Sequence, residues 1–528
     1  MPLPDWPKAS GRGRKLSRKM LTKGKNMAKA YLIGAGPGDP GLITVKGQRL
    51  LQECEVIIYD YLASKTFLSL CRPDAEIIYV GKKGGDHTLP QDQINDLIVA
   101  KVREGKNVAR LKGGDPYIFG RGAEEAEELL EAGLEFEVVP GVTSAVAGAA
   151  YAGIPLTHRK YASSVSLITG HEDPTKPDSA HNWPALATAA STLCFYMGVK
   201  NLPYISAKLM ENGMRSDMPA ALVRWGTTSK HQSWVSTIGE IAAMAEREGV
   251  KAPSMLIVGE VVQLRDTLNW FEKLPLHGRG VVVTRAREQA SGLKDTLEGL
   301  GAACYEFPTI TIVPLEDYAP VRAAIDKLQD YDWVIFTSVN GVRHFWNQLE
   351  LVGKDARALG GLQVAAIGPA TAEALLERGI RPDFIPPKYV AESVVEGLLE
   401  RGVVGKKVLI PRAKVAREVL PEELAKVAGQ VDVLPVYETK LTEEDGAEIV
   451  ELLEKGRLHY LTFSSSSTVE NFFALVPADT LRPYVAKGLR ICCIGPVTAK
   501  TLKEYGFVPD IMPEDYTIPA LVEALVKG

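Results

Sequence analysis

Short apolar, β-rich runs alternate with helix-compatible stretches from residue 30 to about residue 140. The runs are AYLI (30–33), EVIIYD (55–60), EIIYV (76–80), NVARL (107–111) and EFEVVP (135–140). Helix-compatible stretches lie between them, for example at 91–104 and in the Glu-, Ala- and Leu-rich segment 123–132. This alternation predicts an α/β domain built on a mainly parallel sheet.

A second series of β-rich runs follows Gly141. It comprises SVSLITG (164–170), TLCFYMG (192–198), AALVRWG (220–226) and SMLIVGE (254–260). The segment EKLPLHGRG (272–280) then interrupts the pattern with Pro and Gly, which favours a domain boundary. We therefore expect a first region at 28–272, with subdomains at about 28–140 and 145–272, and a linker at 273–280.

The remaining segment contains an internal repeat. VVVTRA (281–286) recurs as VLIPRA (408–413), VIFTSVNGVRHF (334–345) as LTFSSSSTVENF (461–472), and AIGPATAEALLERG (366–379) as CIGPVTAKTLKEYG (493–506). The offset is 127 residues each time, which predicts two similar α/β lobes in 281–528 with a ligand cleft between them. We place lobe 1 at about 281–310 plus 440–528 and lobe 2 at about 316–434, with PTITIVPL (308–315) and LPVYETK (434–440) crossing between them as a paired β linker.

Composition narrows the class of protein. A chain of 528 residues is too long for one core, and it contains no run of about 18 apolar residues that would span a membrane. Its start lacks the layout of a signal peptide. The six cysteines show neither a C-x-x-C pair nor the His spacing of a zinc site. We therefore expect a cytoplasmic protein with reduced cysteines and no structural metal.

The charge is unevenly distributed. Residues 1–27 carry eight Lys or Arg against a single acidic residue, although the whole chain has a net charge of −4. This segment is interpreted either as a disordered or mis-assigned start or as a nucleic-acid-binding arm. Because the rest of the chain is acidic, nucleic acid is not expected as the main partner.

The first apolar run ends in the Gly-rich turn IGAGPGD (33–39). A dinucleotide fingerprint has the spacing G-x-G-x-x-G, whereas this turn has G-x-G-x-G. Pro37 removes a backbone N–H that a diphosphate would use, and Asp39 adds a negative charge. The turn therefore favours an uncharged or cationic ligand, with a purely structural turn as the alternative.

Small residues also follow other predicted strands, in LKGGDP (111–116), PGVTSA (140–145), YMG (196–198) and WGTT (225–228). The carboxyl ends of strands are where open α/β sheets bind ligands. Together with GAGPGDPGLIT, RLKGGDPYIFGRG (110–122), GIPLTHR (153–159) and LITGH (167–171), these motifs resemble uroporphyrinogen-III C-methyltransferase. The resemblance covers about 28–270.

The resemblance implies a tetrapyrrole-methylase fold that binds S-adenosylmethionine between two α/β subdomains. The implied cofactor contacts are Pro37, Gly113, Gly114, Asp115, Ile118, Thr143, Ser144, Met197 and Gly226. The resemblance also implies Asp60 as proton acceptor and Lys82 as proton donor. A carboxylate base is chemically reasonable, because methylation of a pyrrole carbon creates a cation that must lose a proton. A strand-end turn residue and a surface lysine are the alternative interpretations.

The implied substrate carries eight carboxylates, which basic side chains would bind. Arg121 and Arg159 are the candidate contacts, with Lys83 and Lys112 beside them. The sequence departs from the family pattern at Tyr61, where an arginine is often expected, so that one substrate contact is in doubt.

The segment 279–528 resembles uroporphyrinogen-III synthase through VVVTRA, VIFTSVNGV, LIPRA, VYET, TFSSSSTVENF and CIGPVTAKTL. The implied reaction closes linear hydroxymethylbilane with inversion of the terminal pyrrole and needs no cofactor. The candidate substrate-binding hydroxyls in this segment are Thr337, Ser338, Thr371, Ser465 and Thr498. Tyr437 is the candidate for proton transfer or ring positioning, with packing inside the linker as an equal alternative.

Together the two resemblances predict a bifunctional enzyme. The second region would make uroporphyrinogen III, and the first would methylate it at carbons 2 and 7 to precorrin-2, on the way to sirohaem or cobalamin. We expect carboxylate-rich tetrapyrroles as ligands, no nucleic acid or membrane partner, and a homodimer formed through the methyltransferase domain. A nicotinamide-dependent oxidoreductase and a non-catalytic, tetrapyrrole-binding second region remain as alternatives.

Overall fold

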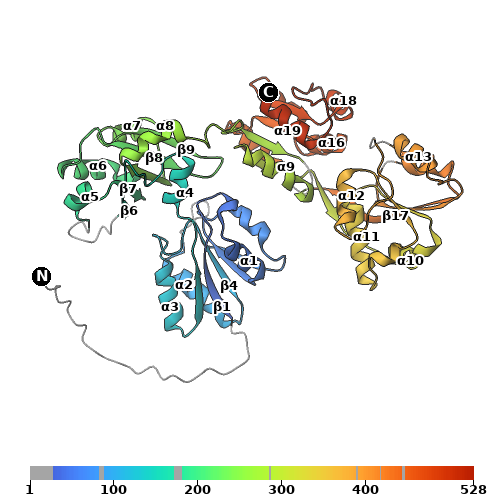
Figure 1. Ribbon diagram of the computed structural model, residues 1–528, viewed down its shortest axis with the longest axis horizontal. Coiled ribbons are helices and arrows are strands. Elements are labelled where there is room, and N and C mark those ends of the chain that lie inside the picture. Colours follow the sequence, from blue (N-terminus) through green and yellow to red (C-terminus); the bar gives the residue numbers. More distant parts are fainter. Residues whose placement is uncertain are drawn as a thin grey trace. The chain divides into compact units, whose positions relative to one another are not determined.

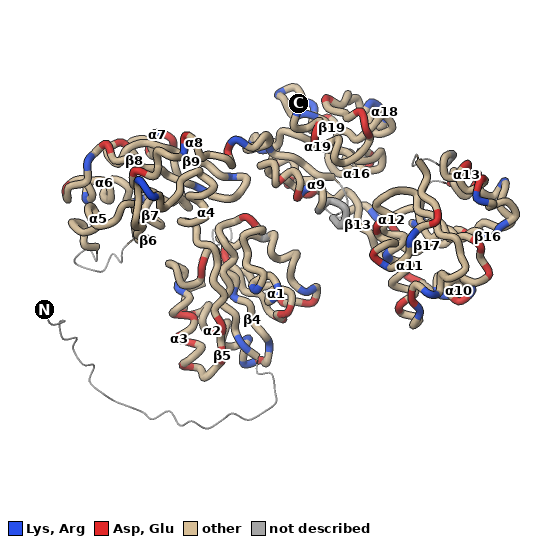
Figure 2. The backbone as a smooth tube through the Cα atoms, viewed as in Figure 1, with Lys and Arg blue, Asp and Glu red and all other residues tan. Residues whose placement is uncertain are grey.

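The computed structural model describes residues 28–81, 89–171, 181–284, 287–387, 391–416, 418–442 and 446–528. The chain divides into two compact units, one ending at Phe271 and the other beginning at Glu272 (Figure 1). The basic segment 1–27, Lys82 and Lys83 lie outside the described residues. Along the described chain, basic and acidic residues are interspersed in both units (Figure 2). Among these residues, no helix combines the length and apolar character that crossing a bilayer requires.

The first unit begins with a five-stranded sheet that is fully parallel, in agreement with the mainly parallel sheet that the alternating pattern predicts. Its strand order is β3-β2-β4-β1-β5. Its strands are β1 (Lys29–Gly34), β2 (Val56–Tyr59), β3 (Glu76–Tyr79), β4 (Val108–Lys112) and β5 (Glu135–Val139). Helix α1 (Val45–Glu53) packs on one face, and α2 (Gln91–Arg103) and α3 (Gly122–Glu131) pack on the other (Figure 1). All residues of β2 and β4 are buried because helices cover both faces of these inner strands.

The second sheet of this unit is mixed, in the order β6-β7-β10-β8-β9. Its strands are β6 (Val165–Thr169), β7 (Thr192–Tyr196), β8 (Pro219–Arg224), β9 (Gln232–Thr237) and β10 (Ser254–Val258). The accompanying helices are α4 (Ser144–Tyr151), α5 (Trp183–Ala189), α6 (Leu202–Glu211), α7 (Ile241–Arg247) and α8 (Arg265–Leu268). The sequence pattern does not predict β9, an antiparallel edge strand whose residues are exposed or half-buried and therefore form no apolar run.

One lobe of the second unit is a four-stranded parallel sheet in the order β12-β11-β18-β19. Its strands are β11 (Gly280–Val283), β12 (Ala303–Glu306), β18 (Tyr460–Phe463) and β19 (Arg490–Cys493). Its helices are α9 (Arg287–Gly299), α15 (Ala447–Glu454), α16 (Ser466–Leu475), α17 (Ala478–Val485), α18 (Pro496–Glu504) and α19 (Ile518–Lys527). Apolar clusters on both sheet faces form the core of this lobe.

The other lobe has a five-stranded sheet in the order β13-β17-β16-β14-β15. Its strands are β13 (Ile310–Val313), β14 (Trp333–Phe336), β15 (Gln363–Ala366), β16 (Lys407–Ala413) and β17 (Gln430–Leu441). Its helices are α10 (Ala319–Asp326), α11 (Val339–Leu351), α12 (Pro369–Leu376), α13 (Ala391–Leu399) and α14 (Val419–Ala425). Strand β13 pairs antiparallel with the end of β17, from Ile310 opposite Leu441 to Val313 opposite Glu438, which confirms the β crossover linker.

The repeat is exchanged between the lobes. Strands β11 and β12 of the first copy correspond to β16 and β17 of the second, and β14 and β15 correspond to β18 and β19. Each sheet therefore joins the opening strands of one copy to the closing strands of the other. This exchange requires the chain to cross between the lobes twice, as β13 and β17 do.

Candidate functional site

The turns that follow β1 and β4 are bonded to each other at the centre of the first sheet. The Gly114 N–H donates to the Gly36 carbonyl (2.7 Å), and the Gly36 N–H donates to the Gly114 carbonyl (3.2 Å). Both glycines have left-handed φ angles, +75° and +71°, which other residues adopt at a cost. The Gly141 N–H donates to Asp115 Oδ2 (2.9 Å), so that the turn after β5 is tied to the same point.

A cavity of about 890 Å³ opens beside these turns and is lined by residues of both subdomains. All nine residues predicted to bind the cofactor line it: Pro37, Gly113, Gly114, Asp115, Ile118, Thr143, Ser144, Met197 and Gly226. Asp60 and Arg121 also line it, whereas Arg159 is not among the lining residues. The structure therefore gathers strand-end motifs spread over almost 200 residues at one cavity.

Strained backbone is concentrated around this cavity. Four lining residues other than glycine have left-handed φ angles: Phe119 (53°), Arg121 (58°), Met197 (55°) and Trp225 (49°). Such conformations cost free energy and persist only where the surrounding structure enforces them, which is typical of ligand-binding sites.

The hydroxyl of Tyr196, at the end of β7, lies at the start of α4. It is 2.7 Å from Thr143 Oγ1 and accepts the Ala145 N–H (3.2 Å), a donor that the helix itself leaves unpaired. Burial raises the pKa of Tyr196, so that the phenol stays neutral and can both accept and donate.

The sequence suggests that Asp39 places a negative charge beside a ligand. In the structure, its carboxylate is hydrogen-bonded to other parts of the protein. It accepts hydrogen bonds from the Tyr151 hydroxyl (2.5 Å) and the Gly41 N–H (2.7 Å), and its own N–H donates to Thr227 Oγ1 (3.1 Å). Burial and the bond to Asp39 raise the pKa of Tyr151. Asp39 thus connects its own turn to Tyr151 and Thr227 by hydrogen bonds, and it does not line the cavity.

Asp60 follows β2 and is fixed by two hydrogen bonds. The Leu62 N–H donates to Oδ1 (3.1 Å), and Arg110 Nη2 donates to Oδ2 (3.0 Å). Arg110 and the neighbouring Lys112 belong to β4, are buried, and line the cavity. The sequence interpretation missed Arg110, although two basic residues at alternate positions of an otherwise apolar strand were a visible signal.

Aromatic rings stand at the exposed side of the cavity. Tyr61 is 61% exposed, and its ring meets that of Trp225 edge-on, with 5.7 Å between centroids. Tyr61 comes from the first subdomain and Trp225 from the second, so that the pair spans the cavity wall. Arg121, which also lines the cavity, is 56% exposed and forms an ion pair with Glu124 (2.6 Å).

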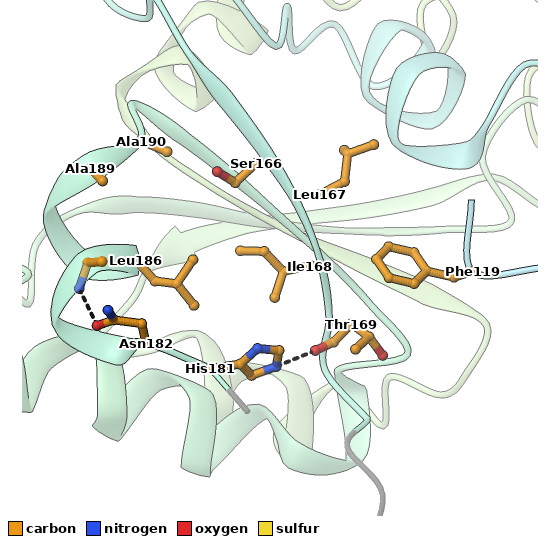
Figure 3. A pocket seen from close by; sticks show the side chains of 11 residues that line it. Phe119, Ser166, Leu167, Ile168, Thr169, His181, Asn182, Leu186, Ala189 and Ala190 are labelled. Carbon is orange, nitrogen blue, oxygen red and sulfur yellow. Dashed lines mark hydrogen bonds between the residues drawn. The ribbon is translucent and has the colours of Figure 1, made fainter. Parts of the chain in front are cut away.

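A smaller cavity of about 350 Å³ lies between the edge strand β6 and α5 (Figure 3). Its polar groups are partly engaged, since His181 Nε2 lies 2.8 Å from the Thr169 carbonyl and Asn182 Oδ1 accepts the Ala185 N–H (3.2 Å). Leu186 and Ile168 supply much of the remaining surface, and Phe119 borders both cavities.

In the second unit, Tyr437 of β17 lies at the start of α11. Its hydroxyl is 3.2 Å from Ser338 Oγ, and its ring stacks on His344 with 5.3 Å between centroids. Tyr437 is only 7% exposed and belongs to an apolar cluster, as the packing interpretation expects. The structure thus brings Tyr437 and Ser338, two predicted site residues, into contact.

The remaining predicted hydroxyls are shared between the two lobes. Ser338 and Ser465 are the N-caps of α11 and α16, and each accepts a backbone N–H of the first turn. Thr371 and Thr498 are buried near the starts of α12 and α18, and Thr337 is half-buried. Helices α12 and α18 begin at Pro after Gly and have no side-chain cap, so that their first N–H groups are available to an anion.

Comparisons with known proteins agree with this geometry. Residues 29–242 match the tetrapyrrole (corrin/porphyrin) methylases, and residues 291–523 match uroporphyrinogen-III synthase HemD. The porphyrin biosynthesis protein HemD of Ruminiclostridium josui is 38% identical over 94% of this chain and 97% of its own length. The chain belongs to this family of fused tetrapyrrole methylases and uroporphyrinogen-III synthases.

Further relatives match one unit of this fused methylase–synthase. The uroporphyrinogen-III C-methyltransferase of Priestia megaterium is 51% identical over 45% of this chain and 99% of its own. The siroheme synthase of Stutzerimonas stutzeri is 51% identical, but the chain spans only 54% of its length. A solved structure of uroporphyrin-III C-methyltransferase from Thermus thermophilus, complexed with S-adenosyl homocysteine, is 38% identical over 45% of this chain and all of its own, with a TM-score of 0.38.

Proposed function

We propose that the first unit of this methylase–synthase transfers methyl groups from S-adenosylmethionine to carbons 2 and 7 of uroporphyrinogen III, giving precorrin-2. The second unit forms uroporphyrinogen III from hydroxymethylbilane with inversion of ring D. The observation that carries the methyltransferase proposal is that all nine predicted cofactor residues line one cavity. Membership of the fused family supports the pairing of the two reactions.

The cavity wall suits S-adenosylmethionine better than a dinucleotide. Its turns present backbone rather than side chains: a Cβ at Gly113 would lie 2.5 Å from Leu62 Cβ, and one at Gly226 would lie 2.7 Å from Gly148 Cα. Backbone carbonyls and amides can hold a nucleoside and an amino acid, whereas Pro37 withholds the N–H that a diphosphate needs. When bound, the cofactor supplies an electrophilic methyl group.

Asp60 is the proposed proton acceptor. Its side chain is 28% exposed at the cavity wall, and each carboxylate oxygen accepts one hydrogen bond, which leaves further lone pairs for a proton. A carboxylate at this place can remove the proton that the methylated ring carbon must lose. Lys82 is the proposed proton donor. It lies outside the described residues, so this role rests on the family resemblance alone.

In the second unit, Tyr437 and Ser338 are proposed to orient the reactive pyrrole. A preformed contact between the two hydroxyls, 3.2 Å apart, offers a donor and an acceptor without a metal or cofactor. The open first turns of α12 and α18 are suited to carboxylate side chains of the linear substrate. Orientation of a reactive intermediate can by itself contribute much of the rate.

A two-stage assay tests both halves. Hydroxymethylbilane is supplied first without S-adenosylmethionine, and the product isomer is determined; we expect the inverted type III isomer. Labelled S-adenosylmethionine is then added, and two labelled methyl groups per macrocycle are expected. Accumulation of only the symmetric isomer would leave the second unit as a non-catalytic tetrapyrrole-binding domain, and absence of label in the macrocycle would contradict the methyltransferase.

A further inference from the structure

A buried charge cluster forms one wall of the methyltransferase cavity. Side chains alternate along a strand, so that Arg110 and Lys112 of β4 project to the same face of the sheet, where α2 and α3 cover it. Glu125 of α3 lies between them: its Oε1 accepts from Arg110 Nε (3.1 Å) and from Lys112 Nζ (2.6 Å). Gln91 of α2 donates to the same oxygen (3.2 Å).

The cluster is nearly inaccessible to water. The side chains of Arg110, Lys112 and Glu125 are 3%, 4% and 0% exposed. Burial, reinforced by the Arg110 charge, lowers the pKa of Lys112. Removing three charges from water is costly, and well-packed apolar residues in such a place often stabilise a core equally well. The arrangement therefore indicates a role other than stability.

The cluster is connected to the proposed reaction through one bond. Arg110 Nε and Lys112 Nζ both donate to Glu125 Oε1, which anchors the guanidinium at its Nε side. Within the described residues, Glu125 Oε2 is buried without a hydrogen-bond partner. The front edge of that guanidinium, Nη2, donates to Asp60 Oδ2 at 3.0 Å. Among these groups, Asp60, Arg110, Lys112 and Gln91 line the cavity, whereas Glu125 does not.

We propose that Arg110 is a positioning residue for methyl transfer: anchored by Glu125, it fixes the orientation of the Asp60 carboxylate toward the substrate. The proposal rests on the proposed function of Asp60 as proton acceptor. Nη2 holds Oδ2 and the Leu62 N–H holds Oδ1, which prevents rotation of the carboxylate about its last bond. A base held in this way is preorganised, so that the entropic cost of orienting it does not add to the barrier of the reaction.

A double-mutant cycle in the full chain tests the proposal. Asp60→Asn should lower kcat for methylation of uroporphyrinogen III by roughly 100-fold or more, because a general base is lost. Arg110→Lys, which keeps the charge but shortens the reach, should lower kcat by about 10- to 100-fold through misplacement of Asp60. If Arg110 acts through Asp60, the double variant should be within about twofold of Asp60→Asn alone.

Binding of S-adenosylmethionine, measured by calorimetry, should be unchanged in all three variants. Arg72→Lys is the matched control, since Arg72 forms an exposed ion pair with Asp74 in the same unit, at 2.6 Å. Its turnover should equal that of the unmodified enzyme.

The outcomes separate the inference from the function on which it rests. Multiplicative losses in the double variant, or normal turnover by Asp60→Asn, would overturn the positioning role. Failure of the unmodified enzyme to methylate uroporphyrinogen III would instead contradict the proposed function. If Arg110→Lys and Arg110→Gln both lose cooperative thermal unfolding, Arg110 is a structural residue and the inference is wrong.

Discussion

At the scale of single residues, backbone conformation and side-chain chemistry act together at the cavity. Gly114 has a φ of +71°, and a Cβ built on it would meet no atom closer than Thr143 Cα at 3.8 Å. The position is therefore restricted by its backbone angle and by the cavity that it lines, rather than by crowding. Substitution should thus affect the ligand more than the packing.

Gly114→Val tests this interpretation. A β-branched residue at this φ costs about 1–2 kcal/mol, and its side chain would enter the space beside Thr143. We expect affinity for S-adenosylmethionine, measured by calorimetry, to fall by at least about tenfold. Gly133→Val is the matched control, because Gly133 has the same φ of +71° but lies outside the cavity. Equal loss of affinity in both variants would show that strain alone is responsible.

Tyr61→Ala tests the aromatic side of the cavity. Loss of the Tyr61–Trp225 contact should raise KM for the tetrapyrrole by roughly two- to tenfold, the range expected of one aromatic contact, with S-adenosylmethionine affinity unchanged. Tyr61→Phe should retain the normal KM. Tyr117→Ala is the control, since Tyr117 is 51% exposed but does not line the cavity. An unchanged KM in Tyr61→Ala would remove Tyr61 from substrate recognition.

At the scale of elements, the sequence predicted β-rich runs and turns well because both are local properties. The runs 30–33 and 254–260 became β1 and β10, since β-branched and apolar residues suit buried strands. Strand β9 was missed because its pairing with β8, rather than its own composition, makes it a strand. The start of β11 illustrates such long-range pairing: Gly280 donates to the imidazole of His459, 179 residues away (2.9 Å).

Because of the His459 imidazole, we expect the free energy of unfolding of the second unit to depend on pH. Burial, followed by the Arg279 charge, lowers the pKa of His459 from its ordinary 6.5. The unfolded chain then binds a proton at His459 more readily than the folded chain does. The contribution of His459 to the free energy of unfolding is therefore fully present above pH 6.5 and is lost as the pH falls below it. Denaturant unfolding at pH 7.5 and pH 5.5 should show the loss. His459→Gln should reduce the difference between the two pH values, and an undiminished difference would contradict the assignment.

At the scale of the whole molecule, two reactions are assigned to two compact units, each with its own core. No proposed site residue of one unit belongs to the other. The two activities are therefore expected to be separable by substitution within the intact chain.

Tyr437→Phe and Asp60→Ala test this separation reciprocally. Tyr437→Phe removes the hydroxyl next to Ser338 but keeps the ring on His344, so that synthase activity should fall while methylation of supplied uroporphyrinogen III stays normal. Asp60→Ala should reduce methylation, by about 100-fold, and leave the synthase and S-adenosylmethionine binding unchanged. Loss of both activities in either variant would indicate coupling between the units.

The sequence by itself determined the alternation of strands and helices, the glycine-rich turns and the repeat of 127 residues. These follow from sterics and burial over neighbouring positions. The nine cofactor residues were expected from the family resemblance, and the strand order of two sheets brings them to one cavity. Only the tertiary structure decided which polar side chains meet: Asp60 with Arg110, Asp39 with Tyr151, and Tyr437 with Ser338. It also exchanged the opening strands of the repeat between the lobes. The physical reason is that such pairings depend on the order and register of strands far apart in sequence, which no local pattern of residues specifies.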